Sequence, residues 1–300
     1  MKKKLINQVG KNLPYRSIRA INDPEVLRFL KEITKKLDFH KITKDKYLQN
    51  KFLKTYKNWI LSSKLNNVKS LNRFKYSCYT SGSTQVFDYF YAKNKNRRFR
   101  AFKGEYAYHY NSWRSHFKKW KFIKNLDLKK NDAVVISMPF SDTGSKHQEM
   151  EKLIKKCNKL NIPVLVDCCY FAMCKGITFN FNQKCINEIA FSLSKAFPVS
   201  RVRIGMRLSK KDDDDPLFFV NKLGLINRLG AYYGLKLIKK FKFDYLHKKY
   251  SKLQTYYCDK LELEPSALVN LGIGGKKWNA YNRGNKTNRV CLSSLYEKKR

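Results

Sequence analysis

A lysine with an unusual set of neighbours is the chemically most informative residue of this chain. Lys195 follows an apolar run that begins at Phe191, has hydroxyl groups nearby at Ser192 and Ser194, and precedes Arg203 by eight residues. A desolvated lysine amine loses its proton more readily, and the neutral amine can attack an aldehyde. Hydroxyls and a guanidinium suit a phosphate group. The spacing therefore predicts a lysine that forms a Schiff base with a phosphorylated aldehyde cofactor.

Two segments further upstream are placed to complete such a site. Gly82–Thr84 lies between Phe74–Tyr79, which alternates like a strand, and Gln85–Tyr91, a predicted helix. Backbone N–H groups at the start of a helix bind anions. Asp167 directly follows Ile162–Val166, a predicted buried parallel strand. Ligands of parallel sheets bind at the carboxyl ends of the strands, so Asp167 is placed to contact one.

The order of these motifs resembles that of the fold-type I pyridoxal-phosphate enzymes, specifically the class I and II aminotransferases. The motifs are the Gly-Ser-Thr segment 82–84, Asp-x-x-Tyr at Asp167 to Tyr170, Ser-x-Ser-Lys ending at Lys195, and Arg-x-Gly at Arg203. Each motif alone is common, and the signal lies in their order. The resemblance covers residues 77–207 well and residues 263–295 more loosely.

The resemblance implies a role for each residue. Lys195 would form the Schiff base and move the substrate's α-proton, Asp167 would pair with the pyridine nitrogen, and Tyr170 would bond the cofactor's phenolic oxygen. A charge pair about 4 Å apart gains roughly 4 kcal/mol at an effective dielectric of 20. That gain is worth about three pKa units, enough to keep the ring nitrogen protonated. The phosphate would be held by Gly82, Ser83, Thr84, Ser192 and Arg203.

Three further assignments rest on the same resemblance. Tyr106 lies where the family places an aromatic ring stacked on the cofactor, with Tyr108 and Tyr110 as close competitors. Arg289 resembles the arginine of the small domain that clamps the substrate's α-carboxylate, a task that suits guanidinium better than ammonium. Ser141 stands where the family has an asparagine that reaches the phenolic oxygen, and it is a shorter donor.

The strong positive charge allows a second class of function. The formal net charge is +41, and a field of this sign attracts nucleic acid or anionic membranes. However, the charge comes from 49 lysines and 15 arginines spread over nearly every segment. Phosphate-reading surfaces usually concentrate arginine on one face. We therefore interpret the charge as compositional and expect no specific nucleic-acid partner.

The remaining composition bounds the class of protein. Hydrophobic residues make up 43% of the chain, which excludes a disordered protein. Eight cysteines show no Cys-x-x-Cys pair, so we expect reduced thiols and no metal site. No apolar run approaches the roughly 20 residues needed to span a bilayer, and no signal-peptide hydrophobic region is present. The expected location is the cytoplasm, without a membrane partner.

Short apolar strands alternate with amphipathic helices along most of the chain. This alternation predicts an α/β fold with a mostly parallel sheet between helical layers. The resemblance implies the three-layer α/β/α fold type I with a small α+β domain. The expected strands are Phe74–Tyr79, Arg98–Phe102, Ala133–Met138, Ile162–Val166, Ile189–Leu193, Arg201–Leu208, Ala267–Leu271 and Arg289–Ser293. The expected helices cover residues 24–37, 45–62, Gln85–Tyr91 and Ser145–Leu160, with two long helices over Leu217–Leu261.

Two acid–proline pairs and the domain limits complete the expected organisation. Asp23 before Pro24, and the acidic run Asp212–Asp215 before Pro216, are typical of capped helix starts. We prefer this interpretation of the acidic run to a metal site. The expected division has three parts. Residues 1–68 form an N-terminal helical segment that contributes to a small domain, residues 69–240 form the large cofactor-binding domain, and residues 241–300 form the C-terminal small domain.

The leading hypothesis is an aminotransferase that uses pyridoxal 5'-phosphate to move an amino group from an amino acid to a 2-oxo acid. By resemblance, we expect a homodimer. Two alternatives stay open: a decarboxylase or lyase of the same fold, and a non-catalytic, basic nucleic-acid-binding protein. The motifs do not identify the substrate side chain.

Overall fold

The central element of the fold is a seven-stranded sheet with the strand order β2-β9-β8-β6-β5-β3-β4. The computed structural model describes residues 9, 18–110, 117–212 and 215–297. Strands from β8 to β4 pair in parallel, whereas β9 runs antiparallel to both of its neighbours. The predicted mostly parallel sheet is thus confirmed. Its strands are β2 (Tyr76–Ser81), β3 (Arg98–Ala101), β4 (Lys119–Phe122), β5 (Asp132–Ser137), β6 (Val164–Asp167), β8 (Ile186–Ser192) and β9 (Ile204–Ser209).

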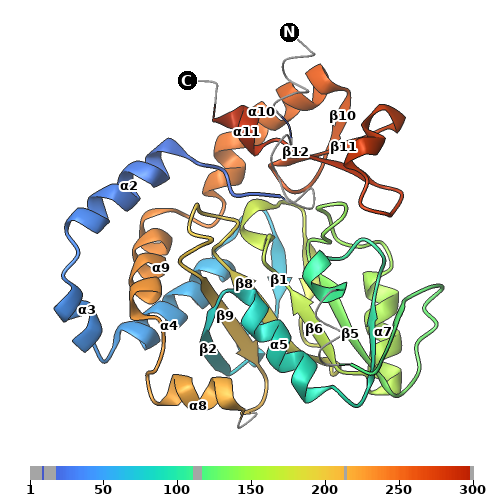
Figure 1. The fold of residues 1–300 in the computed structure, drawn as a ribbon, viewed down its shortest axis with the longest axis horizontal. Helices are drawn as coiled ribbons and strands as arrows, with labels where there is room; N and C mark the ends of the chain where they lie inside the picture. Colours follow the sequence, from blue (N-terminus) through green and yellow to red (C-terminus); the bar gives the residue numbers. More distant parts are fainter. Residues whose placement is uncertain (1–8, 10–17, 111–116, 213–214, 298–300) are drawn as a thin grey trace.

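Helices cover both faces of this sheet (Figure 1). Alternate residues of β5 show the two sides: Ala133 and Val135 pack in the apolar cluster that contains α5, and Val134 and Ile136 in the cluster that contains α4, α7 and α9. Because both faces are covered, every residue of β5 and β6 is buried, as expected for inner parallel strands. The helices of these layers are α4 (Leu48–Leu61), α5 (Ser83–Lys93), α7 (Met150–Leu160) and α9 (Arg228–Lys240).

A second, smaller sheet lies at one end of the molecule, at the top of Figure 1. It consists of three antiparallel strands and lies beside two helices of the C-terminal part. The segment that begins at Ile18 runs next to it: the Arg19 carbonyl accepts hydrogen bonds from Asn270 and Ser293. The elements of this region are β10 (Leu263–Pro265), β11 (Leu271–Gly274), β12 (Asn288–Cys291), α10 (Tyr245–Leu261) and α11 (Ser293–Tyr296).

Short elements connect these layers. Strands β1 and β7 form a separate parallel pair, and the remaining helices lie at the edge of the main sheet or in connections. These elements are α2 (Pro24–Lys35), α3 (Phe39–Lys44), α8 (Pro216–Lys222), β1 (Asn67–Lys69), β7 (Thr178–Asn180), and the 3-10 turns Leu71–Arg73, Phe171–Met173 and Lys276–Tyr281. Within the described ranges, no helix is long and apolar enough to cross a membrane.

Both predicted acid–proline helix starts are confirmed. The Asp23 carboxylate accepts hydrogen bonds from the N–H groups of Glu25 and Val26, 3.0 Å each, at the start of α2. Asp215 accepts from the Phe218 N–H at 2.8 Å and starts α8. A cap of this kind is worth about 1 kcal/mol. Asp213 and Asp214 of the predicted run lie outside the described residues.

Several predicted boundaries of helices and strands were wrong. The predicted helix at 45–62 begins only at Leu48, residues 145–149 precede α7 as turns, and three helices rather than two cover Leu217–Leu261. The strand predicted at Ala267–Leu271 is mostly a connection between β10 and β11. The buried Gln254 side chain contacts this connection, and its amide nitrogen lies 2.9 Å from the carbonyls of Ser266, Leu268 and Leu271.

Candidate active site

Most of the predicted site residues line a single cavity at the carboxyl ends of β6 and β8. Its free volume is about 90 Å³. Small-molecule sites usually measure roughly 300 Å³ or more, so side chains at this cavity have to move for a ligand to enter. The predicted residues that line it are Ser83, Thr84, Tyr106, Asp167, Tyr170, Ser192, Lys195 and Arg203.

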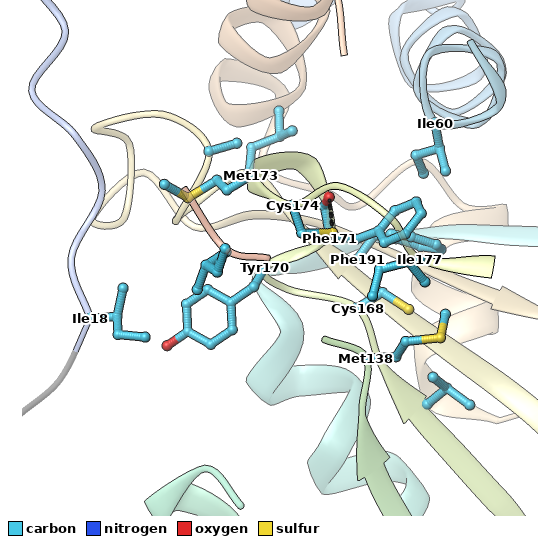
Figure 2. Packing of buried hydrophobic residues seen from close by; sticks show 14 of the residues in the cluster. Ile18, Ile60, Met138, Cys168, Tyr170, Phe171, Met173, Cys174, Ile177 and Phe191 are labelled. Atoms are coloured by element: carbon cyan, nitrogen blue, oxygen red, sulfur yellow. Dashed lines mark hydrogen bonds between the residues drawn. The ribbon is translucent and has the colours of Figure 1, made fainter. Parts of the chain in front are cut away.

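Lys195 is positioned by the buried segment that follows β8. Its neighbours Leu193, Ala196 and Phe197 are at most 2% exposed, whereas Lys195 itself is half-buried. Its amine donates a 2.8 Å hydrogen bond to the backbone carbonyl of Ile18. Figure 2 shows Ile18 and Tyr170 at the edge of the apolar cluster that includes Phe171 and Phe191. The lysine therefore extends from an apolar wall toward the N-terminal segment.

Asp167 ends β6 and is held from two sides. Its Oδ1 accepts the Cys169 N–H at 3.0 Å, and its Oδ2 lies 3.6 Å from Nε2 of His109. The other ring nitrogen of His109 lies 2.5 Å from the Tyr91 hydroxyl. Burial raises the pKa of Tyr91 well above its usual value, so the phenol keeps its proton. Tyr91, His109 and Asp167 thus form a buried polar row behind the cavity.

Arg203 lies over the start of α5. Its Nη2 donates to the Ser81 carbonyl at 3.1 Å and to the Thr84 hydroxyl at 2.7 Å. A Cβ on Gly82, which has a φ of +71°, would lie 2.5 Å from that nitrogen. A Cβ on Gly205 would lie 2.8 Å from the backbone of Gly82. The two glycines thus allow the guanidinium and the first N–H groups of α5 to converge.

The sequence matches the family model for class I and II aminotransferases over residues 58–257, two thirds of the chain. The chain belongs to the class I and II aminotransferase family. Members of this family use pyridoxal phosphate, and the protein is a pyridoxal-phosphate-dependent transferase. No curated protein matches the sequence.

Solved structures with the same fold include both aminotransferases and a decarboxylase. Tyrosine aminotransferase from Leishmania infantum has a TM-score of 0.63 at 13% identity, and the alignment covers 91% of this chain and 87% of that enzyme's chain. Histidinol-phosphate aminotransferase from Clostridium acetobutylicum has a TM-score of 0.61 at 14% identity, with coverage of 94% and 95%. L-Threonine-O-3-phosphate decarboxylase from Porphyromonas gingivalis has a TM-score of 0.55 at 16% identity, with coverage of 74% and 83%. At these identities the likeness shows the fold alone.

The donors of the cavity fit the phosphate of this family's cofactor. Helix α5 has 11 residues, and no side chain of the described residues caps its N-terminus. The N–H groups of its first turn, the Thr84 hydroxyl and the Arg203 guanidinium lie together, as an anion requires. Ser192 and Ser194 also line the cavity, 2.9 Å apart through their hydroxyls. The site of this aminotransferase-family chain therefore holds both an anion cradle and a lysine.

The three candidate tyrosines of the stretch 106–110 are separated by the structure. Tyr106 lines the cavity. The Tyr108 hydroxyl donates to the Asp88 carboxylate at 2.8 Å, and the Tyr110 hydroxyl donates to the Phe102 carbonyl at 3.1 Å. Of the three, only Tyr106 is in position to contact a ligand in the cavity.

Ser141 and Arg289 lie next to the cavity but do not line it. The Arg289 guanidinium donates to the Ser141 carbonyl, and the two residues are 3% and 1% exposed. Burial raises the pKa of the Tyr170 phenol to about 12. The nearby positive charge of Arg289 lowers the same pKa and so limits the increase. Burial lowers the pKa of Arg289 itself to about 10. The structure therefore brings Arg289 close to Tyr170.

Three residues of the site region were missed by the sequence analysis. Glu105 and His109 lie within three residues of Tyr106. Their closeness in the sequence to a predicted ligand contact is the one signal that could have indicated them. Glu105 is fully buried and accepts the Ser137 N–H at 2.7 Å, and burial raises its pKa to about 7. Arg283 lies beside Ser141, six residues before Arg289.

No cluster of three or more possible metal ligands occurs in the part of the chain that the structure describes.

Proposed function

We propose that this protein is an aminotransferase that moves the amino group of an amino acid to a 2-oxo acid. The observation that carries the proposal is the meeting of Lys195, Asp167 and Arg203 in one cavity at the carboxyl edge of the sheet. A binding protein that only kept the fold would have no use for a lysine, a carboxylate and an anion cradle in these positions.

When bound, pyridoxal phosphate supplies an electron sink for the negative charge that develops on the substrate's α-carbon. Arg203, the first turn of α5 and the Ser192 hydroxyl would hold its phosphate. Asp167 would stabilise positive charge on its ring nitrogen. The Cys169 N–H holds that carboxylate, and His109 lies beside it. Tyr106 would cover the ring.

Lys195 would move the proton from the substrate's α-carbon to the carbon of the cofactor's aldehyde group, as a general acid and base. For this task its amine has to leave the Ile18 carbonyl. Tyr170 would donate a hydrogen bond to the phenolic oxygen, because a phenol with a pKa of about 12 is protonated at neutral pH. Arg289 would bind the substrate's α-carboxylate, and Ser141 would reach the phenolic oxygen only with help from its neighbours, since it does not line the cavity.

A panel of amino donors tests the proposal. Transamination requires that a donor convert the cofactor from its aldehyde form to its aminated form, which changes the absorbance, and that a 2-oxo acid be released. Release of carbon dioxide without a 2-oxo acid would instead identify the decarboxylase alternative. Lys195→Ala should lose either activity. If no donor changes the absorbance of the cofactor-loaded protein, the proposed function is wrong.

We also propose that two copies associate. Support comes from an apolar patch formed by four exposed side chains near the start of α4 and the α8–α9 connection. Hydrogen bonds from Gln49 to Asn221, 3.0 Å, and from Arg228 to the Asp45 carbonyl, 2.7 Å, link these two segments. The patch consists of Tyr47, Phe219, Leu223 and Leu225, which are 55–69% exposed. Exposed apolar clusters of this kind mark association surfaces.

The division into residues 1–68, 69–240 and 241–300 also remains a proposal. It is supported by the separate small sheet of the C-terminal part and by contacts from the first segment to it. Asp23 accepts hydrogen bonds from the Tyr250 hydroxyl at 2.6 Å and from Lys249 at 2.7 Å.

A further inference from the structure

Glu105 is a buried acid that is held by polar groups rather than by a cation. It is fully buried, its Oε1 accepts the Ser137 N–H at 2.7 Å, and its Oε2 contacts the Ser137 hydroxyl. The Tyr106 N–H donates to Oε2 at 3.3 Å. Among the residues that the structure describes, no lysine, arginine or histidine forms an ion pair with this carboxyl group. Because the burial of an acid without a cation is costly, a role for Glu105 at the site is expected.

A second buried acid lies on the same strand and shows the more usual arrangement. Asp132 begins β5, whereas Ser137 ends it. Asp132 is 1% exposed and forms ion pairs with Arg98 at 2.7 Å and Arg100 at 2.9 Å. Charge pairing therefore accounts for the burial of Asp132. The burial of Glu105 has to be explained by what its hydrogen bonds hold in place.

The anchor of Glu105 lies next to Asp167. Ser137 and Asp167 are the last residues of β5 and β6, and they are partners in the register of these two parallel strands. Glu105 is thus fixed to the carboxyl edge of the sheet, one strand away from the carboxylate that the proposed function assigns to the cofactor's ring nitrogen.

The segment that follows Glu105 carries two residues of the site. Tyr106 lines the cavity, and Nε2 of His109 lies 3.6 Å from Oδ2 of Asp167. The His109 N–H donates to the Tyr106 carbonyl at 2.9 Å, so the two residues belong to one turn. A displacement of Glu105 would therefore move both Tyr106 and His109 with respect to Asp167.

We propose that Glu105 is a positioning residue whose hydrogen bonds to Ser137 set where Tyr106 and His109 lie relative to Asp167. The inference rests on the proposed function for the roles of Tyr106 and Asp167, which cover the cofactor's ring and pair with its nitrogen. Acting through these residues, Glu105 would raise the affinity for pyridoxal phosphate and fix the orientation of its ring.

Two substitutions separate the hydrogen bonds of Glu105 from its size. Leucine fills a similar volume but leaves the N–H and the hydroxyl of Ser137 without this acceptor. Glu105→Leu should therefore weaken pyridoxal-phosphate binding by roughly tenfold or more in a fluorescence titration. Glutamine can accept the N–H and donate to the hydroxyl, as a protonated carboxyl group does. Because burial raises the pKa of Glu105 to about 7, the protonated form is well populated at neutral pH, and Glu105→Gln should bind within roughly threefold of wild type.

The circular dichroism of the bound cofactor in its visible absorbance band reports how the ring is oriented. A loss of stability alone does not change this signal at saturating cofactor. Glu105→Leu should lower the amplitude of the band, and Glu105→Gln should preserve it. Asp132→Asn is the matched control, because it removes the charge of an equally buried acid at the other end of β5. It should lower Tm and leave both the affinity and the dichroism unchanged.

A substitution of the partner residue tests the same contact if Glu105→Leu does not fold. Ser137→Ala removes the hydroxyl and keeps the N–H that Glu105 accepts. It should weaken cofactor binding by roughly two- to tenfold, the effect of one lost hydrogen bond.

The outcomes separate this inference from the proposed function. Unchanged affinity and dichroism in folded Glu105→Leu or in Ser137→Ala would overturn the inference. So would an equal change in Asp132→Asn, which would show a general effect on the strand, or a Glu105→Gln variant as weak as Glu105→Leu, which would show that hydrogen bonding is not the cause. Neither measurement depends on an amino donor, so failure of every donor would overturn the aminotransferase proposal alone.

Discussion

The Lys195 amine and the Ile18 carbonyl lie 2.8 Å apart, although 177 residues separate them in the sequence. The neighbouring Arg19 carbonyl is bonded to Asn270 at 2.8 Å and to Ser293 at 3.0 Å. The segment at Ile18 and Arg19 therefore connects the lysine with the C-terminal sheet. A single hydrogen bond to a neutral carbonyl is worth about 1 kcal/mol, so the amine can exchange it for a ligand contact at little cost.

The anion cradle can be tested with two glycines that share a backbone conformation. Gly82 and Gly176 have φ angles of +71° and +73°, so alanine at either position should cost about 1 kcal/mol of stability. Only at Gly82 would the new Cβ displace the Arg203 guanidinium, because nothing lies within 4 Å of a Cβ at Gly176. Gly82→Ala should therefore weaken pyridoxal-phosphate binding by roughly tenfold or more, and Gly176→Ala should not. Equal affinities in a fluorescence titration would contradict the assignment of the cradle.

Loss of the Asp167 carboxylate should lower kcat more than it lowers the affinity for the cofactor. Loss of a charge interaction worth about three pKa units predicts a decrease in kcat of roughly 100- to 1000-fold for Asp167→Asn. His109→Gln, which alters only a neighbour of that carboxylate, should lower kcat by roughly tenfold. The exposed His40 provides the control variant His40→Gln. Steady-state kinetics that showed no difference between the two histidine variants would argue against a role for His109.

Glu105 should make stability fall as the pH rises toward neutrality. Burial raises the pKa of this carboxyl from 4.5 to about 7, so the folded protein holds the proton more tightly than the unfolded chain does. Its stabilising contribution is complete below about pH 4.5 and is lost as the pH passes 7. Relative to wild type, Glu105→Gln should gain about 2–3 kcal/mol in the free energy of unfolding between pH 5 and pH 8.

Urea unfolding at both pH values measures this difference. Burial lowers the pKa of His247 to about 4, which makes stability rise with pH, but both proteins contain this histidine and its effect cancels. The exposed Glu264 provides a control, and Glu264→Gln should show no such gain. A constant difference between Glu105→Gln and wild type across this range would rule out the raised pKa.

Self-association should depend on the apolar patch. Light scattering at micromolar concentration should report a dimer for the wild type, and a monomer for a double variant with glutamate at Phe219 and Leu225, because two buried charges without partners are costly at an interface. Leu27 on α2 is 41% exposed and lies outside the patch, so Leu27→Glu should remain dimeric. A monomeric wild-type protein with full activity would show that the site is complete in one chain.

The sequence analysis identified the sheet and the cavity because both depend on local patterns. Fully buried strands such as β5 are apparent as apolar runs, and Asp167 and Lys195 follow such runs directly. Helix starts were equally accessible, since Asp23 and Asp215 form their caps within three residues.

The missed features depend on contacts between distant parts of the chain. The contact of Ile18 with Lys195 and that of Arg283 with Ser141 span more than 100 residues and leave no local pattern. The connection after β10 was mistaken for a strand because the side chain that contacts its carbonyls, Gln254, lies in α10. His109 is one of five histidines in the sequence, and no local pattern indicates that it lies beside Asp167.

The central claim is that Lys195 is the residue that bonds covalently to pyridoxal phosphate, and peptide mass spectrometry after borohydride reduction tests it most directly. We predict that the cofactor-loaded protein is yellow and that reduction fixes one cofactor on the peptide containing Lys195, with no label in Lys195→Ala. A label on any of the other 48 lysines, or a colourless protein that takes up no cofactor, would contradict the account.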